Sequence, residues 1–201
     1  MENPLKENII SDTIFPVILS VPQTKKSLKG RPMVKYLSEY ARRAVEISAE
    51  KNNINLSDVN LVKNSNGVPI SFNDYFWSLS HKSDFVGGVV ASYRIGIDIE
   101  KVRAFTSGLY KKTASEKEWN LSEDDRAVLF FRYWTAKEAV IKAAGSGLKD
   151  LLRCRIVKII DKNNLVIKYN DKEWYIECFV FNGHISSIVK NDKKVKWTLL
   201  E

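Results

Sequence analysis

Three carboxylates and one lysine occupy two short segments of the chain, where together they could bind a cation and a phosphate group. Asp98 and Glu100 lie in the segment Gly96–Glu100, and Glu138 and Lys142 lie four residues apart in a second segment. Carboxylate oxygens suit Mg²⁺, which usually completes its octahedral coordination with water and substrate phosphates. If the two segments meet in space, they therefore predict a magnesium-dependent phosphoryl-transfer site.

Hydrophobic periodicity predicts the elements that would position these side chains. Ile95, Ile97 and Ile99 alternate with small or acidic residues, which predicts a strand that carries Asp98 and Glu100 on one face. With a rise of about 3.3 Å per residue, the two acidic Cα atoms would lie about 6.5 Å apart. Both carboxylates could then reach one ion near the end of the strand.

The second segment predicts a helix over 125–144, with a capping-box start in 122–125 and a stop at Gly145. Side chains four residues apart project side by side from a helix, so Glu138 and Lys142 should share a face. Taken alone, each segment also fits a bland alternative, a solvated strand edge or a surface ion pair.

Taken together, the segments resemble the paired signature of the 4'-phosphopantetheinyl transferase superfamily. Gly96–Glu100 and Phe131–Ala143 follow each other in the family's order, and Trp77–Lys82 resembles its Ser-His element. Asn66–Pro69 is similar to the Gly-Lys-Pro turn of the larger, surfactin-synthetase-activating class, although Val68 stands where a lysine is common.

The resemblance implies an α+β fold in which two similar α+β halves form a pseudo-dimer within one chain, with the active site in the cleft between them. We expect residues 1–94 to form the N-terminal half, with the contacts to the nucleotide of coenzyme A. Residues 95–201 should form the C-terminal half, with the metal and the catalytic residues.

The resemblance also implies roles for individual side chains. Asp98, Glu100 and Glu138 would hold Mg²⁺, with Mn²⁺ able to substitute, against the diphosphate of coenzyme A, so that Asp98 also belongs to the coenzyme site. Lys142 would contact the coenzyme and neutralise the leaving oxygen. Glu138, directly or through a metal-bound water, would accept the proton of the attacking hydroxyl.

Further coenzyme contacts are expected from the N-terminal half. By the same resemblance, His81 would bind the 3'-phosphate, with Ser80 close to the nucleotide. Lys35 and Arg43 are candidate nucleotide contacts from a basic stretch, although such a stretch also fits a solvated face. His184 has no comparable sequence context and is expected to be structural.

The function implied is transfer of the 4'-phosphopantetheine group from coenzyme A to a serine of an apo acyl or peptidyl carrier protein, with release of adenosine 3',5'-bisphosphate. One alternative is a Mg²⁺-dependent phosphohydrolase or nuclease that uses the same carboxylates. Another is a basic binding module without catalytic activity. A hydrolase would act without a carrier protein, and a binding module would tolerate loss of Asp98 or Glu138.

Composition is consistent with this function. The 201 residues include 44% hydrophobic residues, enough for a substantial core, and carry a formal net charge of +8. That charge would attract coenzyme A and an acidic carrier protein. No zinc-finger spacing or aromatic RNA-binding signature occurs, so no specific nucleic-acid partner is expected.

The chain is expected to be a cytoplasmic monomer without a membrane partner. Cys154 and Cys178 form no disulfide framework and no metal-ligand cluster, which favours a reducing compartment. The first residues do not have the charged-then-apolar pattern of a signal peptide, and no apolar run approaches the ~18 residues needed to span a bilayer.

Periodicity predicts further elements. Helices are expected over 32–52 and, with loop character, over 107–119, and strands before the 64–69 turn and over 85–92, 155–160, 165–169, 174–181 and 185–189. Asn163-Asn164 and Asn182-Gly183 are expected hairpin turns. Phe105, Tyr110 and Trp119 lie where the family receives the carrier; Trp119 either is exposed for docking or anchors a helix to the core.

Overall fold

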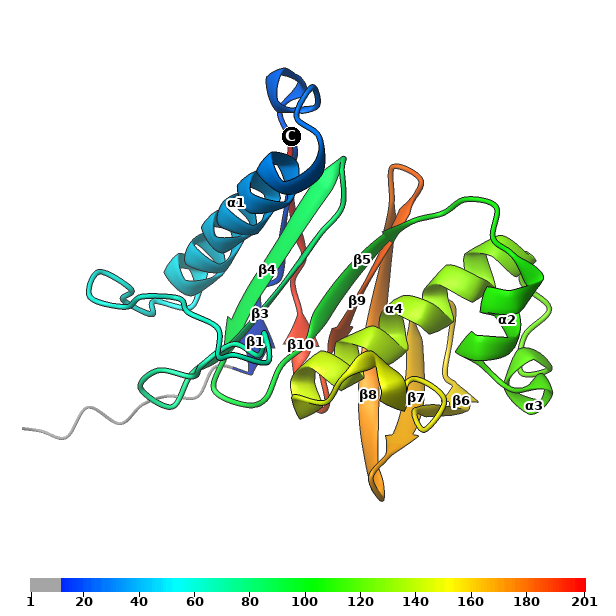
Figure 1. The fold of residues 1–201 in the computed structure, drawn as a ribbon. Coiled ribbons are helices and arrows are strands. Elements are labelled where there is room, and N and C mark those ends of the chain that lie inside the picture. Colours follow the sequence, from blue (N-terminus) through cyan, green and yellow to red (C-terminus); the bar gives the residue numbers. More distant parts are fainter. Residues whose placement is uncertain (1–11) are drawn as a thin grey trace, which may run out of the picture.

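Two large β-sheets, each covered by a long helix, and one separate pair of short strands make up the part of the chain that the computed structural model describes, residues 12–201 (Figure 1). The first sheet has the order β11-β2-β4-β3, formed by Thr198–Leu200, Val17–Ser20, Phe85–Ala91 and Phe76–His81. Its helix is α1, Gly30–Lys51. The mixed α+β class expected from the sequence is therefore confirmed.

The second sheet has the order β5-β9-β8-β7-β6. Its strands are Ile97–Lys101, His184–Val189, Lys172–Phe181, Asn164–Tyr169 and Arg155–Ile159. The helix α4, Arg126–Ala144, packs on this sheet, and the short helices α2, Ser107–Thr113, and α3, Glu116–Trp119, pack beside α4. Two 3-10 turns, Gln23–Lys25 and Leu148–Asp150, complete the helical elements of the described chain.

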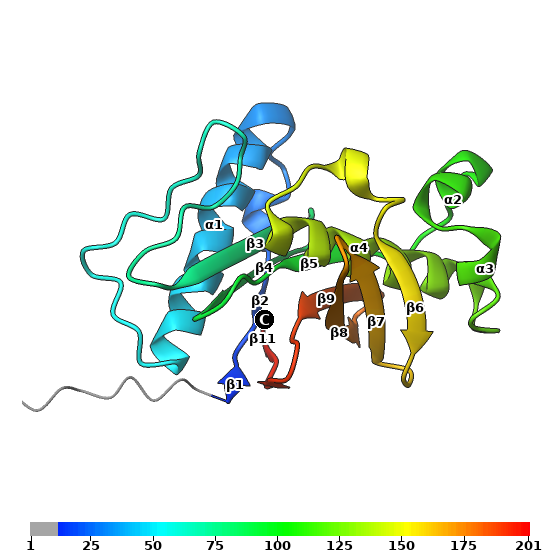
Figure 2. The same cartoon turned by 90° about the horizontal axis from the view of Figure 1, so that it is seen from below.

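The two halves repeat one topology. In the first, the order β2, α1, β3, β4 along the chain gives the sheet order β2-β4-β3, with antiparallel neighbours. In the second, β5, α4, β8 and β9 give the order β5-β9-β8, again antiparallel, and β6 and β7 extend that sheet. Figure 2 shows β3, β4 and β5 between the two helices. This repeat matches the expected pair of similar halves.

The end of the chain returns to the first sheet. β11 pairs in parallel with β2, and β10, Lys194–Val195, pairs in parallel with β1, Thr13–Ile14. β11 therefore completes the N-terminal sheet, and β10 forms a separate two-stranded sheet with β1, although both strands follow the second half in sequence. The predicted division of the chain between residues 94 and 95 stays a prediction. The pairing of β11 with β2 places residues from the end of the chain in the N-terminal sheet.

Alternation along β5 separates its two faces. Ile97 and Ile99 are fully buried, and Ile99 packs with Ile18 and Phe85 of the first sheet. The opposite face of β5 meets α4, because Lys142 of that helix pairs with Asp98. The predicted alternation along β5 therefore points its isoleucines toward the first sheet and its carboxylates toward α4 of the second half.

The long helix ends as predicted, at Gly145 with a left-handed φ of 70°. It begins within one residue of the predicted start, but its cap differs from the predicted capping box: the N-cap is Asp125, whose side chain accepts hydrogen bonds from Ala127 N and Val128 N. The capping box lies instead at the start of α3, where Ser115 and Glu118 form it. A sequence that fits the capping-box pattern therefore does not by itself show where a capping box forms.

Other elements follow the prediction with small shifts, except that the strand expected before the 64–69 turn is reduced to an isolated bridge between Lys63 and Pro69. The short strands β2 and β3 have no counterpart among the predicted elements.

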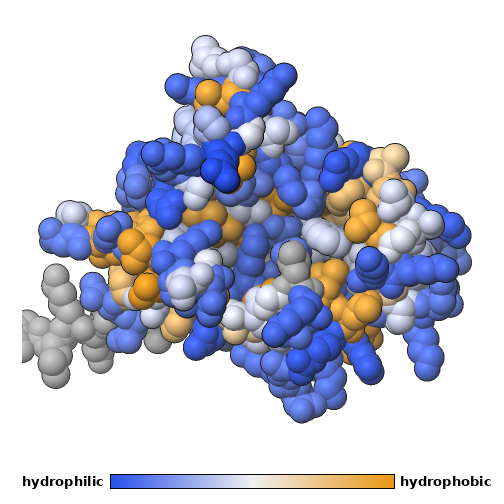
Figure 3. Space-filling view, in the orientation of Figure 1, coloured by the Kyte–Doolittle hydropathy of each residue, from blue (hydrophilic) through white to orange (hydrophobic). Residues whose placement is uncertain are grey.

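No helix in residues 12–201 is long and apolar enough to cross a membrane. The face seen in Figure 1 is largely hydrophilic, with small hydrophobic patches (Figure 3).

Candidate active site

Two serine hydroxyls of β3 join the two halves at the site. Ile97 N–H donates to Ser78 Oγ over 3.1 Å, and Ile99 N–H donates to Ser80 Oγ over 3.2 Å. These bonds satisfy backbone donors of β5 that no neighbouring strand satisfies on that side. The Ser-x-Ser of the Ser-His element thus fixes the edge of the first sheet against the strand that carries the carboxylates.

Asp98 is the most constrained carboxylate of the site. Its side chain is buried, and Oδ1 accepts hydrogen bonds from Ser80 Oγ and from Lys142 Nζ, both at 2.8 Å. Its backbone oxygen accepts from Ser186 Oγ at 2.9 Å. Lys142 Nζ also donates to the Ile97 carbonyl over 3.0 Å. The two segments singled out in the sequence therefore meet.

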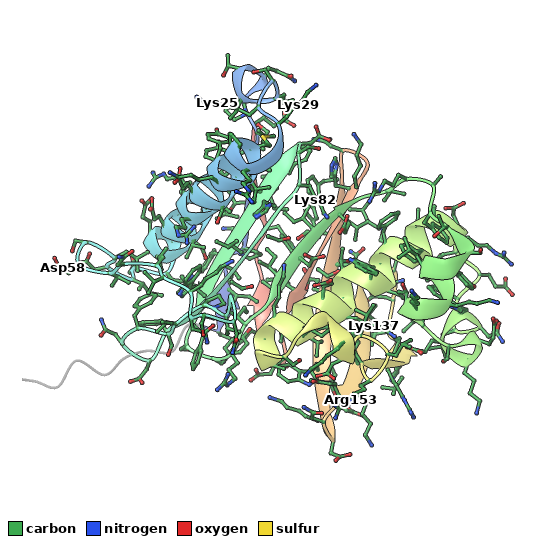
Figure 4. All side chains as sticks on the ribbon, in the orientation of Figure 1. Lys25, Lys29, Asp58, Lys82, Lys137 and Arg153 are labelled. Carbon is green, nitrogen blue, oxygen red and sulfur yellow. The ribbon has the colours of Figure 1, made fainter. Side chains whose placement is uncertain are left out.

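Glu100 lies on the same face of β5 and is also buried. Its Oε1 pairs with Lys82 Nζ at 2.6 Å. Burial raises the pKa of the Glu100 carboxyl, and the charge of Lys82 partly opposes that shift. Lys82 extends from just beyond β3, between the two halves (Figure 4). It lies in the Ser-His element but was not among the predicted site residues.

Glu138 faces the same region from α4. Burial, followed by the charge of Asp98, raises the pKa of Glu138 to about 7, with Lys142 opposing and Glu100 adding to the rise. The three carboxylates therefore share one electrostatic environment, in which negative charge is under-compensated. A carboxyl group with a pKa near neutrality is suited to exchange a proton at physiological pH.

The described residues fit a cation only in part. No three His, Cys, Asp or Glu side chains in residues 12–201 lie close enough together to hold a metal ion. The donor chemistry does suit Mg²⁺, because Asp98 Oδ2 is buried with no hydrogen-bond partner and the pKa of Glu138 is raised by neighbouring negative charge. The magnesium site thus stays a prediction, which these two observations support.

His81 ends β3 in a strongly basic environment. Burial and the charges of Lys142, Lys63 and Lys82 lower the pKa of its imidazole. We call these four residues, His81, Lys63, Lys82 and Lys142, the basic cluster. They suit a phosphate group, and Lys63 was not predicted. His184, by contrast, is buried in the core, where its Nδ1 lies 2.8 Å from the Asn182 carbonyl.

The structure does not bring Lys35 or Arg43 to the carboxylates. Lys35 Nζ lies 3.9 Å from Glu39, and Arg43 lies 3.0 Å from Glu46, both on the same helix. The neighbouring Arg42 instead donates from Nε to the carbonyl of Leu61, two residues before Lys63, over 3.0 Å. The sequence alone did not determine which face of α1 turns toward the cluster.

Lys137 is a structural residue inside the signature segment. It is fully buried, pairs with Glu118 at 2.6 Å, and donates to the Thr113 carbonyl at 2.7 Å. Glu118 in turn accepts a hydrogen bond from Ile156 N. Lys137 therefore holds α4 to α2, α3 and β6, while its neighbour Glu138 points elsewhere, as a rotation of about 100° per residue requires.

The aromatic residues after β5 divide into core and groove. Trp119 is buried and stacks on Tyr110 and Tyr133, so it anchors α3 to α4. A cavity of about 250 Å³ opens beside Glu100. Its lining includes Arg103, Phe105, Leu109, Phe130 and Trp134.

Comparison with known proteins agrees with this site. Residues 94–192 match the model of the 4'-phosphopantetheinyl transferase superfamily. Over this span, just under half of its 201 residues, the chain is similar to that superfamily. The matched span contains β5 and α4, and so all four of the side chains first singled out.

Among curated relatives, the 4'-phosphopantetheinyl transferase gsp of Aneurinibacillus migulanus is 25% identical over 60% of this chain and 53% of its own length. The transferase Sfp of Bacillus subtilis is 27% identical over 53% of this chain and 49% of its own length. A rat L-aminoadipate-semialdehyde dehydrogenase-phosphopantetheinyl transferase is 29% identical over 62% and 43%. The chain thus spans about half the length of the curated relatives it matches, and the bacterial ones support the larger, surfactin-activating class.

Proposed function

We propose that this protein transfers the 4'-phosphopantetheine group from coenzyme A to a serine hydroxyl of an apo acyl or peptidyl carrier protein, as a holo-[acyl-carrier-protein] synthase. The observation that carries this proposal is the 2.8 Å pair between Lys142 and Asp98, which joins the two signature segments into one site. The superfamily match over 94–192 and the names of the relatives support it.

In the proposed reaction, the serine Oγ forms a bond to the phosphorus next to the pantetheine arm. The bond from that phosphorus to the bridging oxygen breaks, and adenosine 3',5'-bisphosphate leaves. Glu138 accepts the serine proton, a role supported by its pKa of about 7. Lys142 places a positive charge where negative charge develops on the leaving group.

Asp98, Glu100 and Glu138 are the residues that would hold Mg²⁺, or Mn²⁺ in its place. When bound, the ion would neutralise the diphosphate and the carboxylates together. Asp98 is held in position by Ser80 and Lys142, so its free Oδ2 is oriented before any ligand arrives. Such preorganisation lowers the cost of aligning the phosphate.

The carrier protein is proposed to dock beside the cavity next to Glu100. Leu109 is exposed there, Arg103 lines the cavity, and Lys111 and Lys112 follow in α2. This combination of apolar and basic groups suits an acidic partner that presents a serine close to the carboxylates.

A cytoplasmic monomer is part of the proposal. Two topologically similar halves already enclose one site within a single chain, so no second copy is needed to complete it. Cys154 and Cys178 are both buried and free, which is typical of proteins in a reducing compartment.

The test is incubation of the purified protein with coenzyme A, Mg²⁺ and a panel of apo carrier proteins, followed by mass spectrometry. A gain of ~340 Da on a carrier that EDTA abolishes is the expected result for metal-assisted transfer. Glu138→Gln should abolish the gain, whereas Glu123→Gln, before the start of α4, should leave it unchanged. Cleavage of coenzyme A without any carrier would instead indicate a hydrolase and contradict the proposal.

A further inference from the structure

The turn between β3 and β4 contacts the end of β5 through two ion pairs of opposite polarity. Lys82, at the start of this turn, places Nζ 2.6 Å from Glu100 Oε1. Asp84, at its end, places Oδ2 3.0 Å from Lys101 Nζ. Glu100 and Lys101 are successive residues of β5, so their side chains point to opposite faces of the sheet. The turn therefore holds the end of the strand on both faces.

Asp84 also joins this turn to other elements. Its Oδ1 lies 3.1 Å from the Nζ of Lys26, which directly follows the 3-10 turn Gln23–Lys25. Its Oδ2 lies 3.6 Å from Nε2 of His184, at the start of β9. Its backbone carbonyl accepts a hydrogen bond from Val21 N–H over 2.8 Å. One residue thus connects the first half to β5 and β9 of the second.

The position of Lys82 depends on the turn that carries it. Among residues 12–201, Lys82 is the one ion-pair partner of Glu100, whose side chain is only 10% exposed. The Lys82 side chain is itself 37% exposed, so packing does not fix it. A long, flexible side chain is then placed by its backbone, which is held by the hydrogen bond from Lys82 N–H to the Phe85 carbonyl and by the Asp84 contacts.

We propose that Asp84 is a positioning residue of the transfer reaction: it holds the 82–84 turn on Lys101 and thereby keeps Lys82 against Glu100. This inference rests on the proposed function. Asp84 need not touch coenzyme A or the carrier serine, because it acts through Lys82. Glu100 is one of the three carboxylates that would hold Mg²⁺, and side chains that orient such a ligand affect both metal affinity and rate.

The test compares Asp84→Asn with wild type in two assays. One is the rate of carrier modification, and the other is the rise in melting temperature that Mg²⁺ alone produces without coenzyme A or carrier. Asp84→Asn should lower kcat and the affinity for Mg²⁺ about 3- to 10-fold, because the orientation of a metal ligand is weakened but not lost. The KM for coenzyme A should change less than about 2-fold. Asp84→Glu keeps the charge and should restore most of the rate.

Asp150→Asn is the matched control for a simple loss of stability. Asp150 also pairs with a basic side chain, since its Oδ1 lies 3.1 Å from the Arg153 guanidinium, and its Oδ2 accepts a hydrogen bond from Tyr169. All three residues lie in the second half, away from the turn. Asp150→Asn should lower the melting temperature and leave kcat and the affinity for Mg²⁺ at wild-type values. The control therefore distinguishes a less stable protein from a displaced Glu100.

A double-variant cycle with Lys82→Met tests the route of the effect. If Asp84 acts through Lys82, adding Asp84→Asn to Lys82→Met should slow the reaction less than about 2-fold further. The same added loss in both backgrounds, or wild-type kcat and Mg²⁺ affinity in Asp84→Asn, would overturn the positioning role and leave the proposed function intact. If wild type modified no carrier protein, the proposed function itself would fail, and the inference with it.

Discussion

Gly96 is the position at which a single added methyl group should separate the carboxylates of β5 from Glu138 and Lys142 of α4. β5 passes α4 so closely that a Cβ atom on Gly96 would lie 1.9 Å from the Ala139 carbonyl oxygen and 2.8 Å from Ala143 N. Both are backbone atoms of a helix, so no side-chain rotation can relieve the overlap. Gly96→Ala therefore requires α4 to move away from β5.

The size of the movement sets the expected effect. Restoring an ordinary contact needs a displacement of about 1 Å or more, and overpacking of this kind typically costs about 1–3 kcal/mol. Ala139 is adjacent to Glu138, while the partner of Lys142 lies on β5, so the same movement separates the groups that the reaction needs together. A misplacement of about 1 Å can slow an enzyme about 100-fold.

The assay compares the rate of carrier modification and the melting temperature of Gly96→Ala with those of wild type. Gly147→Ala is the matched control, since a Cβ atom there meets nothing within 4 Å. We expect a roughly 100-fold lower rate and a lower melting temperature for Gly96→Ala, and wild-type values for the control. A Gly96→Ala protein with normal rate and normal melting temperature would refute the close seating of β5 on α4.

Three further predictions concern charged residues. Lys137→Met should destabilise the protein by about 3–5 kcal/mol in urea unfolding, because it leaves Glu118 buried and unpaired. The double variant Lys137→Met with Glu118→Gln should lose clearly less stability. Equal losses for the two variants would show that the unpaired Glu118 charge does not cause the destabilisation. Lys142→Ala should lower kcat more than it raises KM for coenzyme A, since charge builds on the leaving group, and a change confined to KM would contradict this role. The pKa of Glu138 in the folded protein is about 7, above the ~4.3 of an unfolded glutamate, so the folded state binds more protons between those pH values. Without divalent cations, the stability of the protein should therefore fall as pH rises through that window. The melting temperature of Glu138→Gln should fall less over the same pH range.

The elements that carry the carboxylates were predictable because their signals are local. Alternation of isoleucines with acidic residues defines β5, and Gly145 with its positive φ ends α4 where expected. A spacing of four then places Glu138 and Lys142 together on any helix. These features depend on the backbone period and on one permissive glycine, which tertiary packing does not override.

Other features depend on contacts between distant parts of the chain. β2 and β11 pair although nearly the whole sequence separates them, so no local pattern announces their alignment. The roles of Ser78 and Lys137 likewise depend on partners that only the fold supplies. The orientation of α1 belongs to the same class, and it decides that Arg42 donates to the Leu61 carbonyl while Arg43 pairs with Glu46 on its own helix.

The repeated topology explains why the site lies where the halves meet. Each half alone has a sheet edge, β3 in the first and β5 in the second, and the serine bonds join these edges. The first half brings most of the basic cluster to this line, and the second brings all three carboxylates. Lys142 donates to backbone carbonyls of both strands, at 3.4 Å to Leu79 and 3.0 Å to Ile97. A relative shift of the halves would therefore disturb the basic cluster and the carboxylate alignment together, so the proposed transfer should depend on the junction between β3 and β5 as well as on the side chains of the site.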